Sequence, residues 1–229
     1  MNGKLYIVAT PIGNMSDITF RAIDTLKSVD FILCEDTRVT QKILNHYNID
    51  VKTISYHQHS DDNKVRKIEE LLNEGNSLAL VTDAGTPGIS DPGNLLISQL
   101  LENNSDLEII TIPGASAIIS ILSVSGFPTD KFTFLGFIPQ KNKRKKFIEE
   151  IKTSKKTCVF YESCHRIKKC IKEIAEILEE DREIVIGREL TKKFETIYRT
   201  TIKEILNLDI LEKGEFVIVV RGKNNKNKK

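Results

Sequence analysis

The sequence predicts an α/β fold made of two domains. Along the first half of the 229 residues, short apolar runs alternate with amphipathic stretches, which is typical of a mostly parallel sheet with helices on both faces. This pattern breaks at the proline-containing segment 127–139, where the balance of charge also changes sign. We therefore expect an N-terminal domain over residues 1–122, a C-terminal domain over residues 123–222, and a basic, disordered tail over residues 223–229.

The strands expected in the first domain are apolar almost throughout, as a sheet covered on both faces requires. They comprise residues 5–9, 31–35, 53–57, 77–83 and 107–114. The helices expected after them place apolar residues three and four positions apart. They comprise residues 18–29, a segment from Thr37, a segment from Ser60, and residues 95–103 and 115–126. We expect Ser16 and Asp17 to cap the first helix.

The second domain is expected to hold a mixed sheet. Segment 127–139 leads into its first strand, and the later strands are expected at residues 157–163, 182–190, 196–202 and 215–222. Helices are expected at residues 141–152 and 164–180, on the evidence of their apolar stripes.

Composition limits the class of protein. The N-terminal apolar run 5–9 is too short for a signal peptide or a membrane span, so we expect a cytoplasmic protein with no membrane segment. The chain has 4 cysteines and no C-x-x-C pair, which favours reduced thiols.

The net charge of +2 hides an asymmetry between the two halves. Residues 1–130 hold 9 Lys and Arg against 17 Asp and Glu, a net charge of −8, whereas residues 131–229 hold 25 against 15, a net charge of +10. A basic half suits a polyanion such as RNA, although a Lys- and Asn-rich composition can also reflect genome bias. Segment KNKRKK (141–146) is either a solvated helix start or a patch that contacts phosphates.

Three segments rich in Gly and Pro follow three of the expected strands. They are ATPIGN (9–14), TDAGTPGISDPG (82–93) and IPGASA (112–117). Open parallel sheets bind ligands at the carboxyl ends of their strands, and glycine lets the backbone approach a ligand closely. None of the three segments fits a dinucleotide fingerprint or a P-loop. One such segment is an ordinary turn, but three at the same sheet edge favour a ligand site.

Polar residues follow other strands. CEDTR (34–38) is open to two interpretations, a surface ion pair with Thr37 as a helix cap, or part of the site. His57 and His59 near Asp61 and Asp62 lack further ligands at a supporting spacing, so we expect no metal site. The three later cysteines and His165 are expected on different faces of a strand and a helix, so we do not expect them to form a shared site. Buried thiols are the simpler account of the cysteines.

The motifs LYIVATPIGN, CEDTR, VTDAGTPGISDPG, IPGASA, FYESCHR and GRELTKKFE together resemble a known family. The chain is similar to the tetrapyrrole-methylase-like methyltransferases that use S-adenosylmethionine (SAM). Within them it resembles the bacterial 16S rRNA cytidine 2′-O-methyltransferases of the decoding centre. Tetrapyrrole methylases and diphthine synthases typically have Gly-x-Gly where this chain has TPIG, and GDP where it has GTP (85–87).

The resemblance implies two α/β domains with SAM in the cleft between them, a substrate in 16S rRNA within the 30S subunit, and a homodimer. The cofactor contacts that it implies are Ile12, Gly13, Asp83, Gly85, Thr86, Ile89, Ser116, Ala117, Tyr161 and Leu190. Polarity and position make Asp36, Arg38 and Glu189 candidates for acid–base or substrate-orienting roles. The RNA-binding candidates are Lys141, Lys143, Arg144, Lys145, Lys146 and Arg166.

Two other functions remain open at this point. One is methylation of a corrin or porphyrin precursor by the same fold, and the other is an RNA-associated binding module without catalysis. The TPIGN loop and the basic second half favour RNA over a tetrapyrrole. Members of the resembled family often continue into a C-terminal helical extension, whereas this chain ends in KNNKNKK. We expect any RNA contacts of that extension to be absent or replaced by the basic tail.

Overall fold

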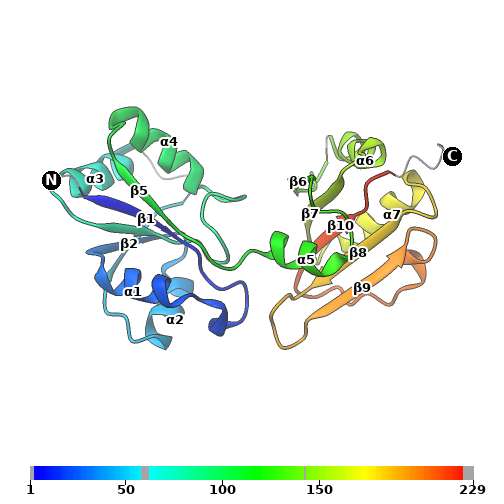
Figure 1. The fold of residues 1–229 in the computed structure, drawn as a ribbon, viewed down its shortest axis with the longest axis horizontal. Helices are drawn as coiled ribbons and strands as arrows, with labels where there is room; N and C mark the ends of the chain where they lie inside the picture. The colour runs from blue at the N-terminus through cyan, green and yellow to red at the C-terminus, as the bar shows by residue number, and fades with distance from the viewer. Residues whose placement is uncertain (1–2, 58–61, 142, 224–229) are drawn as a thin grey trace. The chain divides into compact units, whose positions relative to one another are not determined.

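A computed structural model describes residues 3–57, 62–141 and 143–223 of the chain. It divides into two compact units, Met1–Ser116 and Ala117–Lys229 (Figure 1). The expected domain boundary, between residues 122 and 123, falls inside helix α5 (Ala117–Ser125), and in the structure the whole of that helix belongs to the second unit.

The first unit contains a five-stranded parallel sheet in the order β3-β2-β4-β1-β5. Its strands are β1 (Lys4–Val8), β2 (Phe31–Cys34), β3 (Lys52–Ser55), β4 (Leu78–Leu80) and β5 (Glu108–Ile112). The parallel sheet predicted from the sequence is therefore confirmed. Strand β4 is shorter than the predicted 77–83, and beyond its end the Thr82 carbonyl accepts a hydrogen bond from the Thr10 hydroxyl.

Helices cover both faces of this sheet (Figure 1). They are α1 (Phe20–Ser28), α2 (Thr37–His46), α3 (Asp62–Asn73) and α4 (Gly93–Asn103). Leu96 and Leu100 of α4 and Ile68 of α3 are buried in one apolar cluster, whereas Leu26 of α1 and Leu44 of α2 are buried in another. The sheet therefore has a core on each face, which explains its uninterrupted apolar strands.

The start of α1 differs from the prediction. Ser16 and Asp17 do not cap α1, because they lie in a short 3₁₀ turn, η1 (Met15–Asp17), that the Asn14 side chain caps. The cap of α1 is Thr19, whose Oγ1 accepts a 3.1 Å hydrogen bond from the Ala22 amide. The predicted start of α3 at Ser60 lies outside the described residues.

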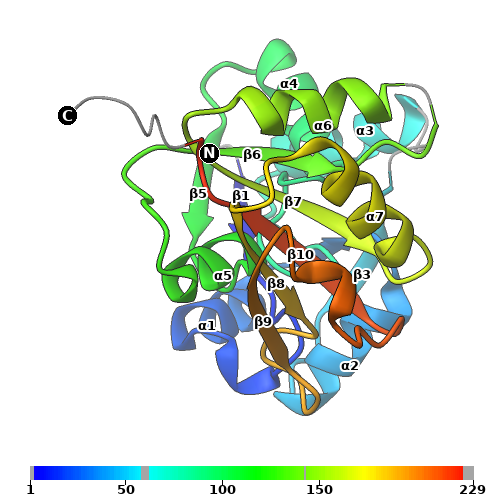
Figure 2. The same cartoon turned by 90° about the vertical axis from the view of Figure 1, so that its right-hand side faces the viewer.

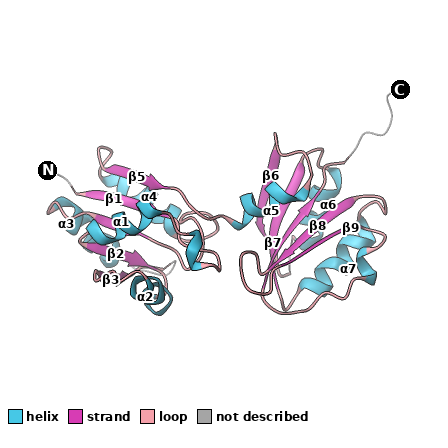
Figure 3. Cartoon of the chain, turned by 60° about the horizontal axis from the view of Figure 1, so that its bottom comes forward, coloured by secondary structure: helices cyan, strands magenta, loops and turns pink. Residues whose placement is uncertain are grey.

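The second unit contains a mixed sheet, as predicted, and its strand order is β6-β7-β10-β8-β9. Its strands are β6 (Phe132–Phe137), β7 (Thr157–Ser163), β8 (Glu183–Arg188), β9 (Thr196–Thr201) and β10 (Glu215–Val220). Helices α6 (Arg144–Thr153) and α7 (Ile167–Ile177) and a 3₁₀ turn, η2 (Ile205–Asn207), complete the unit with α5 (Figure 3). Of the tail expected over residues 223–229, Lys223 is described and its amide donates to the Ser154 carbonyl at 2.8 Å, whereas residues 224–229 lie outside the described residues.

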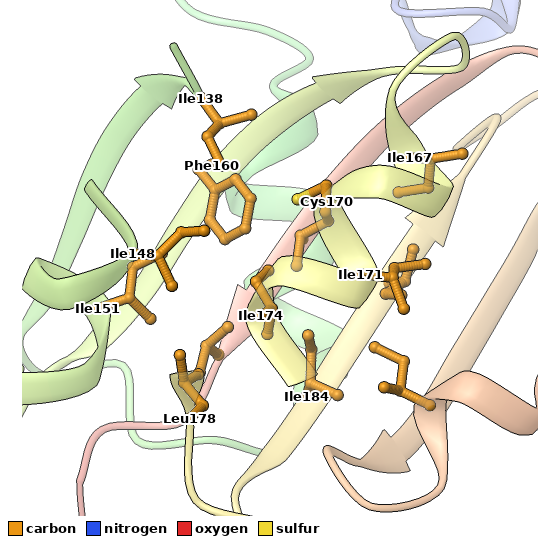
Figure 4. Packing of buried hydrophobic residues seen from close by; sticks show 14 of the residues in the cluster. Ile138, Ile148, Ile151, Phe160, Ile167, Cys170, Ile171, Ile174, Leu178 and Ile184 are labelled. Atoms are coloured by element: carbon orange, nitrogen blue, oxygen red, sulfur yellow. The ribbon is translucent and has the colours of Figure 1, made fainter. Parts of the chain in front are cut away.

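Apolar residues of α6 and α7 pack on one face of this sheet (Figure 4). Ile148 and Ile174 lie against Phe160 of β7 and Ile184 of β8 within one buried cluster. Helix α5 packs on the other face, where Gly187 makes room for it: a Cβ atom there would lie 2.8 Å from Ile121 Cδ1. The glycine thus allows α5 to lie close to the sheet.

The direction of the strands places several loops together. Strands β6 and β7 are parallel, and β10 is antiparallel to both β7 and β8. The carboxyl ends of β6, β7 and β8 therefore share one edge with the start of β9. We call this the carboxyl edge of the second sheet.

The remaining predictions of the fold concern membrane spans and cysteines. Across the described ranges, no helix has both the length and the apolar character that a membrane span needs. The four cysteines are free thiols, and Cys34, Cys158 and Cys170 are buried.

Candidate functional site

The first two Gly- and Pro-rich loops are joined through their backbones. Thr10, just after β1, and Gly85, beyond β4, exchange two hydrogen bonds, with N–O distances of 2.9 Å and 3.2 Å. The Thr10 hydroxyl also donates to the Thr82 carbonyl at 2.9 Å. Thr10 is almost fully buried, so these bonds are shielded from water. The sequence did not mark Thr10 as a site residue, although it forms the connection between the loops.

The third loop, after β5, joins the same assembly. The Ala9 amide donates to the Ile112 carbonyl at 3.1 Å, and the Thr86 hydroxyl donates to the Ala115 carbonyl at 3.4 Å. A Cβ atom on Gly114 would lie 2.9 Å from Ala9 Cβ, so a larger residue would push the two loops apart. The three loops therefore meet at one edge of the first sheet, as their sequence positions predicted.

Asp91 braces the longest of these loops. One of its carboxylate oxygens, Oδ1, accepts hydrogen bonds of 2.7 Å from both the Gly88 and the Gly93 amides. Gly85 and Gly88 have φ angles of 88° and 85°, which side chains rarely allow. The glycines and the aspartate together fix the path of the loop, so the contacts of Asp91 are with the loop itself.

The predicted cofactor contacts of the first unit all lie on this loop assembly. Gly13 and Ile89 are exposed, Asp83, Thr86 and Ser116 are half-buried, and Ile12 and Gly85 are buried. Ala117 is the first residue of α5 and belongs to the second unit.

Asp36 and Arg38 form a tight local pair after β2. Arg38 Nη2 lies 2.6 Å from Asp36 Oδ2, and Asp36 Oδ1 accepts a 2.8 Å hydrogen bond from the Arg38 amide. Asp36, rather than Thr37, is therefore the N-cap of α2. The hydrogen bonds from Arg38 lower the pKa of the Asp36 carboxyl to about 2. A carboxylate held in this way is a weak proton acceptor.

Asp83 connects this pair to the loops, because its Oδ1 accepts a 3.2 Å hydrogen bond from the Asp36 amide. Burial raises the pKa of the Asp83 carboxyl, and this hydrogen bond partly opposes the effect. Glu35 is exposed at the same edge, where partial burial and the charges of Asp83 and Asp91 raise the pKa of its carboxyl. Its side chain also lines a pocket with Tyr56 and Asp91. The sequence placed Glu35 beside the site but did not indicate its raised pKa, because Asp83 and Asp91 are distant in the sequence.

Tyr161 and Leu190 lie at the carboxyl edge of the second sheet. Tyr161 is half-buried, with its ring centroid 5.3 Å from that of Phe134 and 5.1 Å from that of Phe137. Burial raises the pKa of its hydroxyl to about 12, so the phenol stays neutral. Leu190 is 8% exposed and lies against Gly187.

Glu189 is held in place by several contacts. Its Oε1 accepts hydrogen bonds from Lys192 Nζ at 3.0 Å and from the Glu215 amide at 2.9 Å. Burial opposes its charge, but these bonds outweigh burial and lower the pKa of the carboxyl. The contacts therefore favour a positioning role for Glu189 over that of a general base.

The RNA-binding candidates separate into two groups. Lys141, Lys143, Lys145 and Lys146 are exposed. Arg144, in contrast, is 5% exposed, and its guanidinium contacts Glu173 Oε2 and lies 3.3 Å from Glu162 Oε2.

Arg166 is partly buried and lies 2.7 Å from Glu162 Oε1. Glu162 is itself buried. Arg144 therefore connects α6 with β7 and α7, and Arg166 connects the start of α7 with β7. Arg144 is buried and is not part of the exposed basic patch, and RNA binding by the other candidates stays a prediction. Among the described residues, no three His, Cys, Asp or Glu side chains gather as a metal site would require.

A family comparison identifies the class of protein. Residues 4–206 match the family model of the tetrapyrrole (corrin/porphyrin) methylases. The chain belongs to the tetrapyrrole methylase family. Members of this family are methyltransferases, so the predictions of the fold and of a methyltransferase are both confirmed.

Curated relatives show which members of the family this chain is similar to. The chain is 46% identical over 228 residues to a protein of Halalkalibacterium halodurans, covering 98% of this chain and 78% of that protein. It is 47% identical over 223 residues to one of Vibrio cholerae, covering 95% of this chain and 77% of the relative. Both relatives are named ribosomal RNA small subunit methyltransferase I.

Solved structures support the fold alone. A diphthine synthase superposes with a TM-score of 0.73 at 13% identity, covering 96% of this chain and 90% of the other. The methyltransferase CobJ superposes with a TM-score of 0.70 at 17% identity, covering 96% and 94% of the two chains.

Proposed function

We propose that this chain uses SAM to methylate the ribose 2′-hydroxyl of a cytidine in 16S rRNA, at the decoding centre of the 30S subunit. The observation that carries the proposal is the likeness, at 46–47% identity over nearly the whole chain, to relatives named small subunit rRNA methyltransferases. The cytoplasm as the place of action and a homodimer as the working form belong to the same proposal.

The loop assembly of the first unit suits SAM by the chemistry of its residues. The exposed Ile89 offers apolar surface to an adenine ring, with the buried Ile12 behind the loop, and the hydroxyls of Thr86 and Ser116 and the carboxylate of Asp83 offer polar partners to a ribose and an amino-acid group. Gly13 is exposed and has no side chain to keep a ligand from its backbone. All of these contacts are part of the proposal, as are those of Ala117, Tyr161 and Leu190, which belong to the second unit.

SAM supplies a methyl group that its positively charged sulfur already activates, so the protein chiefly has to align the attacking hydroxyl. A ribose hydroxyl gains from a group that accepts its proton. We assign Asp36 an orienting role, together with Arg38, because its carboxylate is engaged by the Arg38 side chain and by the first turn of α2. Glu189 likewise orients the loop that follows β8.

Transfer of tritium from labelled SAM to purified, unmethylated 30S subunits tests this function. We expect label in 16S rRNA, and none when the target ribose already carries a methyl group. Thr86→Arg should abolish both SAM binding and transfer, because its long cation fills the space beside Ala115. Thr86→Ser, which keeps the hydroxyl that donates to Ala115, should retain both. Label that enters only a tetrapyrrole precursor would overturn the proposal.

A further inference from the structure

Residues 189–195 form the loop that joins the neighbouring strands β8 and β9 (Figure 2). Glu189 and Thr191 have φ angles of 50° and 66°, in the left-handed region that side chains disfavour. Such angles persist only where the surroundings hold them, and they cluster at functional sites. This loop lies at the carboxyl edge of the second sheet, next to the start of β10, and the ends of β7 and β6 follow further along the same edge.

Charged side chains fix the loop from both sides. Lys192 Nζ bridges Glu189 Oε1 at 3.0 Å and Glu215 Oε2 at 2.9 Å. Beneath the loop, the buried Arg188 donates to the Phe194 carbonyl at 3.1 Å through Nη1 and to the Lys213 carbonyl at 2.7 Å through Nε. The main chain at Phe194 is therefore tied to the body of the unit.

The side chain that this scaffold presents is apolar and exposed. Phe194 is 67% exposed, although its own carbonyl is held by Arg188. Lys193 Nζ lies 5.6 Å from the centroid of its ring. An exposed phenylalanine does not stabilise the fold by burial, so the fixed backbone needs another explanation. A rigid aromatic ring flanked by a cation fits a flat ligand with negative charge nearby.

The composition of the carboxyl edge indicates RNA as that ligand. Lys193 is the cation beside the ring, and further along the same edge, where β6 ends three strands from β8, Lys141 and Lys143 are exposed and Phe137 is 56% exposed. Aromatic rings set among basic side chains bind single-stranded nucleic acid, because bases stack on the rings while cations contact phosphates. We propose that Phe194 is a stacking platform for an unpaired base of the RNA substrate, with Lys193 contacting the adjacent phosphate. This proposal deepens the proposed function, on which it rests for the nature of the substrate.

Binding of a single-stranded oligoribonucleotide that carries 2-aminopurine, measured without SAM, tests the platform. We expect Phe194→Ala to weaken binding about tenfold, the loss of one stacked base. Phe194→Trp should restore the affinity and quench the 2-aminopurine fluorescence by stacking. The fully paired duplex of the same sequence should be affected much less, because its bases cannot leave the helix to stack.

Phe132→Ala is the matched control, because Phe132 is an exposed phenylalanine at the start of β6, on the opposite edge of the same sheet. It should change the affinity less than twofold. Unchanged circular dichroism of each variant shows that its fold is intact. Equal binding by the wild type and Phe194→Ala would overturn the proposal, as would a wild type that does not bind the single strand. A smaller sedimentation coefficient for Phe194→Ala would overturn it in favour of a contact between protein chains.

The two proposals fail separately. A wild type that stacks the base through Phe194 but transfers no label to 30S subunits refutes the methylation of rRNA and leaves the platform intact. A wild type that labels 16S rRNA while Phe194→Ala binds and labels equally well refutes the platform alone.

Discussion

At the scale of single residues, Arg144 shows how different neighbours in one basic segment can be. Lys143 and Lys145 on either side of it are exposed, whereas Arg144 is 5% exposed and contacts Glu162 and Glu173. Without Arg144, the buried Glu162 keeps Arg166 as a partner but loses part of the compensation of its charge. We expect Arg144→Gln to lower the free energy of unfolding by about 2–3 kcal/mol, measured by urea denaturation, since a hydrogen bond to a charged group contributes about that much.

Lys145→Gln is the matched control, since it removes the same charge from the same turn of α6 at an exposed position. Its effect should stay within about 0.5 kcal/mol. Similar midpoints for the two variants would show that Arg144 is not buried in solution, and the basic segment would then act as one exposed patch.

At the scale of elements, the loop between β4 and α4 depends on one carboxylate. Asp91→Ala removes the acceptor of both the Gly88 and the Gly93 amides, so the loop should lose its fixed path. We expect SAM binding by calorimetry to weaken at least about tenfold, because ordering the loop then costs free energy on binding. The same amides should exchange faster with solvent.

Asp91→Asn keeps an oxygen at Oδ1 and is the control for this substitution. It should retain most of the SAM affinity and most of the amide protection. If Asp91→Asn weakens SAM binding as much as Asp91→Ala while the two amides stay protected, the charge of Asp91 acts on the cofactor rather than on the loop.

Element positions were largely predictable because burial gives the helices an apolar stripe and gives the strands of the first sheet a continuous apolar run. The ends of the elements were less predictable. Four residues before α1 can cap a helix, namely Asn14, Ser16, Asp17 and Thr19, and the contacts of the folded chain select Thr19. The meeting of the three loops was predictable from topology, since parallel strands end at one edge. The pairing of Arg144 with Glu162 was not, because the sequence does not show which side chains meet across two elements.

At the scale of the whole molecule, part of the basic charge of residues 131–229 lies at one edge of the second sheet. Exposed lysines follow β6 at the carboxyl edge of the second sheet, where Tyr161 and Phe194 also lie. If phosphates bind there, each lysine that contacts one releases a counterion when RNA binds. Charge elsewhere on the unit would contribute only a weak, diffuse attraction.

The salt dependence of RNA binding separates these cases. Replacing both Lys143 and Lys145 by Gln should reduce the slope of log K against log salt by about 1.4 for a single strand, the share of two phosphate contacts. The matched pair Lys155 and Lys156 is equally exposed but precedes β7, at the opposite edge, so its replacement should leave the slope nearly unchanged. Equal slopes for both double variants would mean that RNA responds to the net charge of the unit, and the basic segment would then be only a solvated helix start.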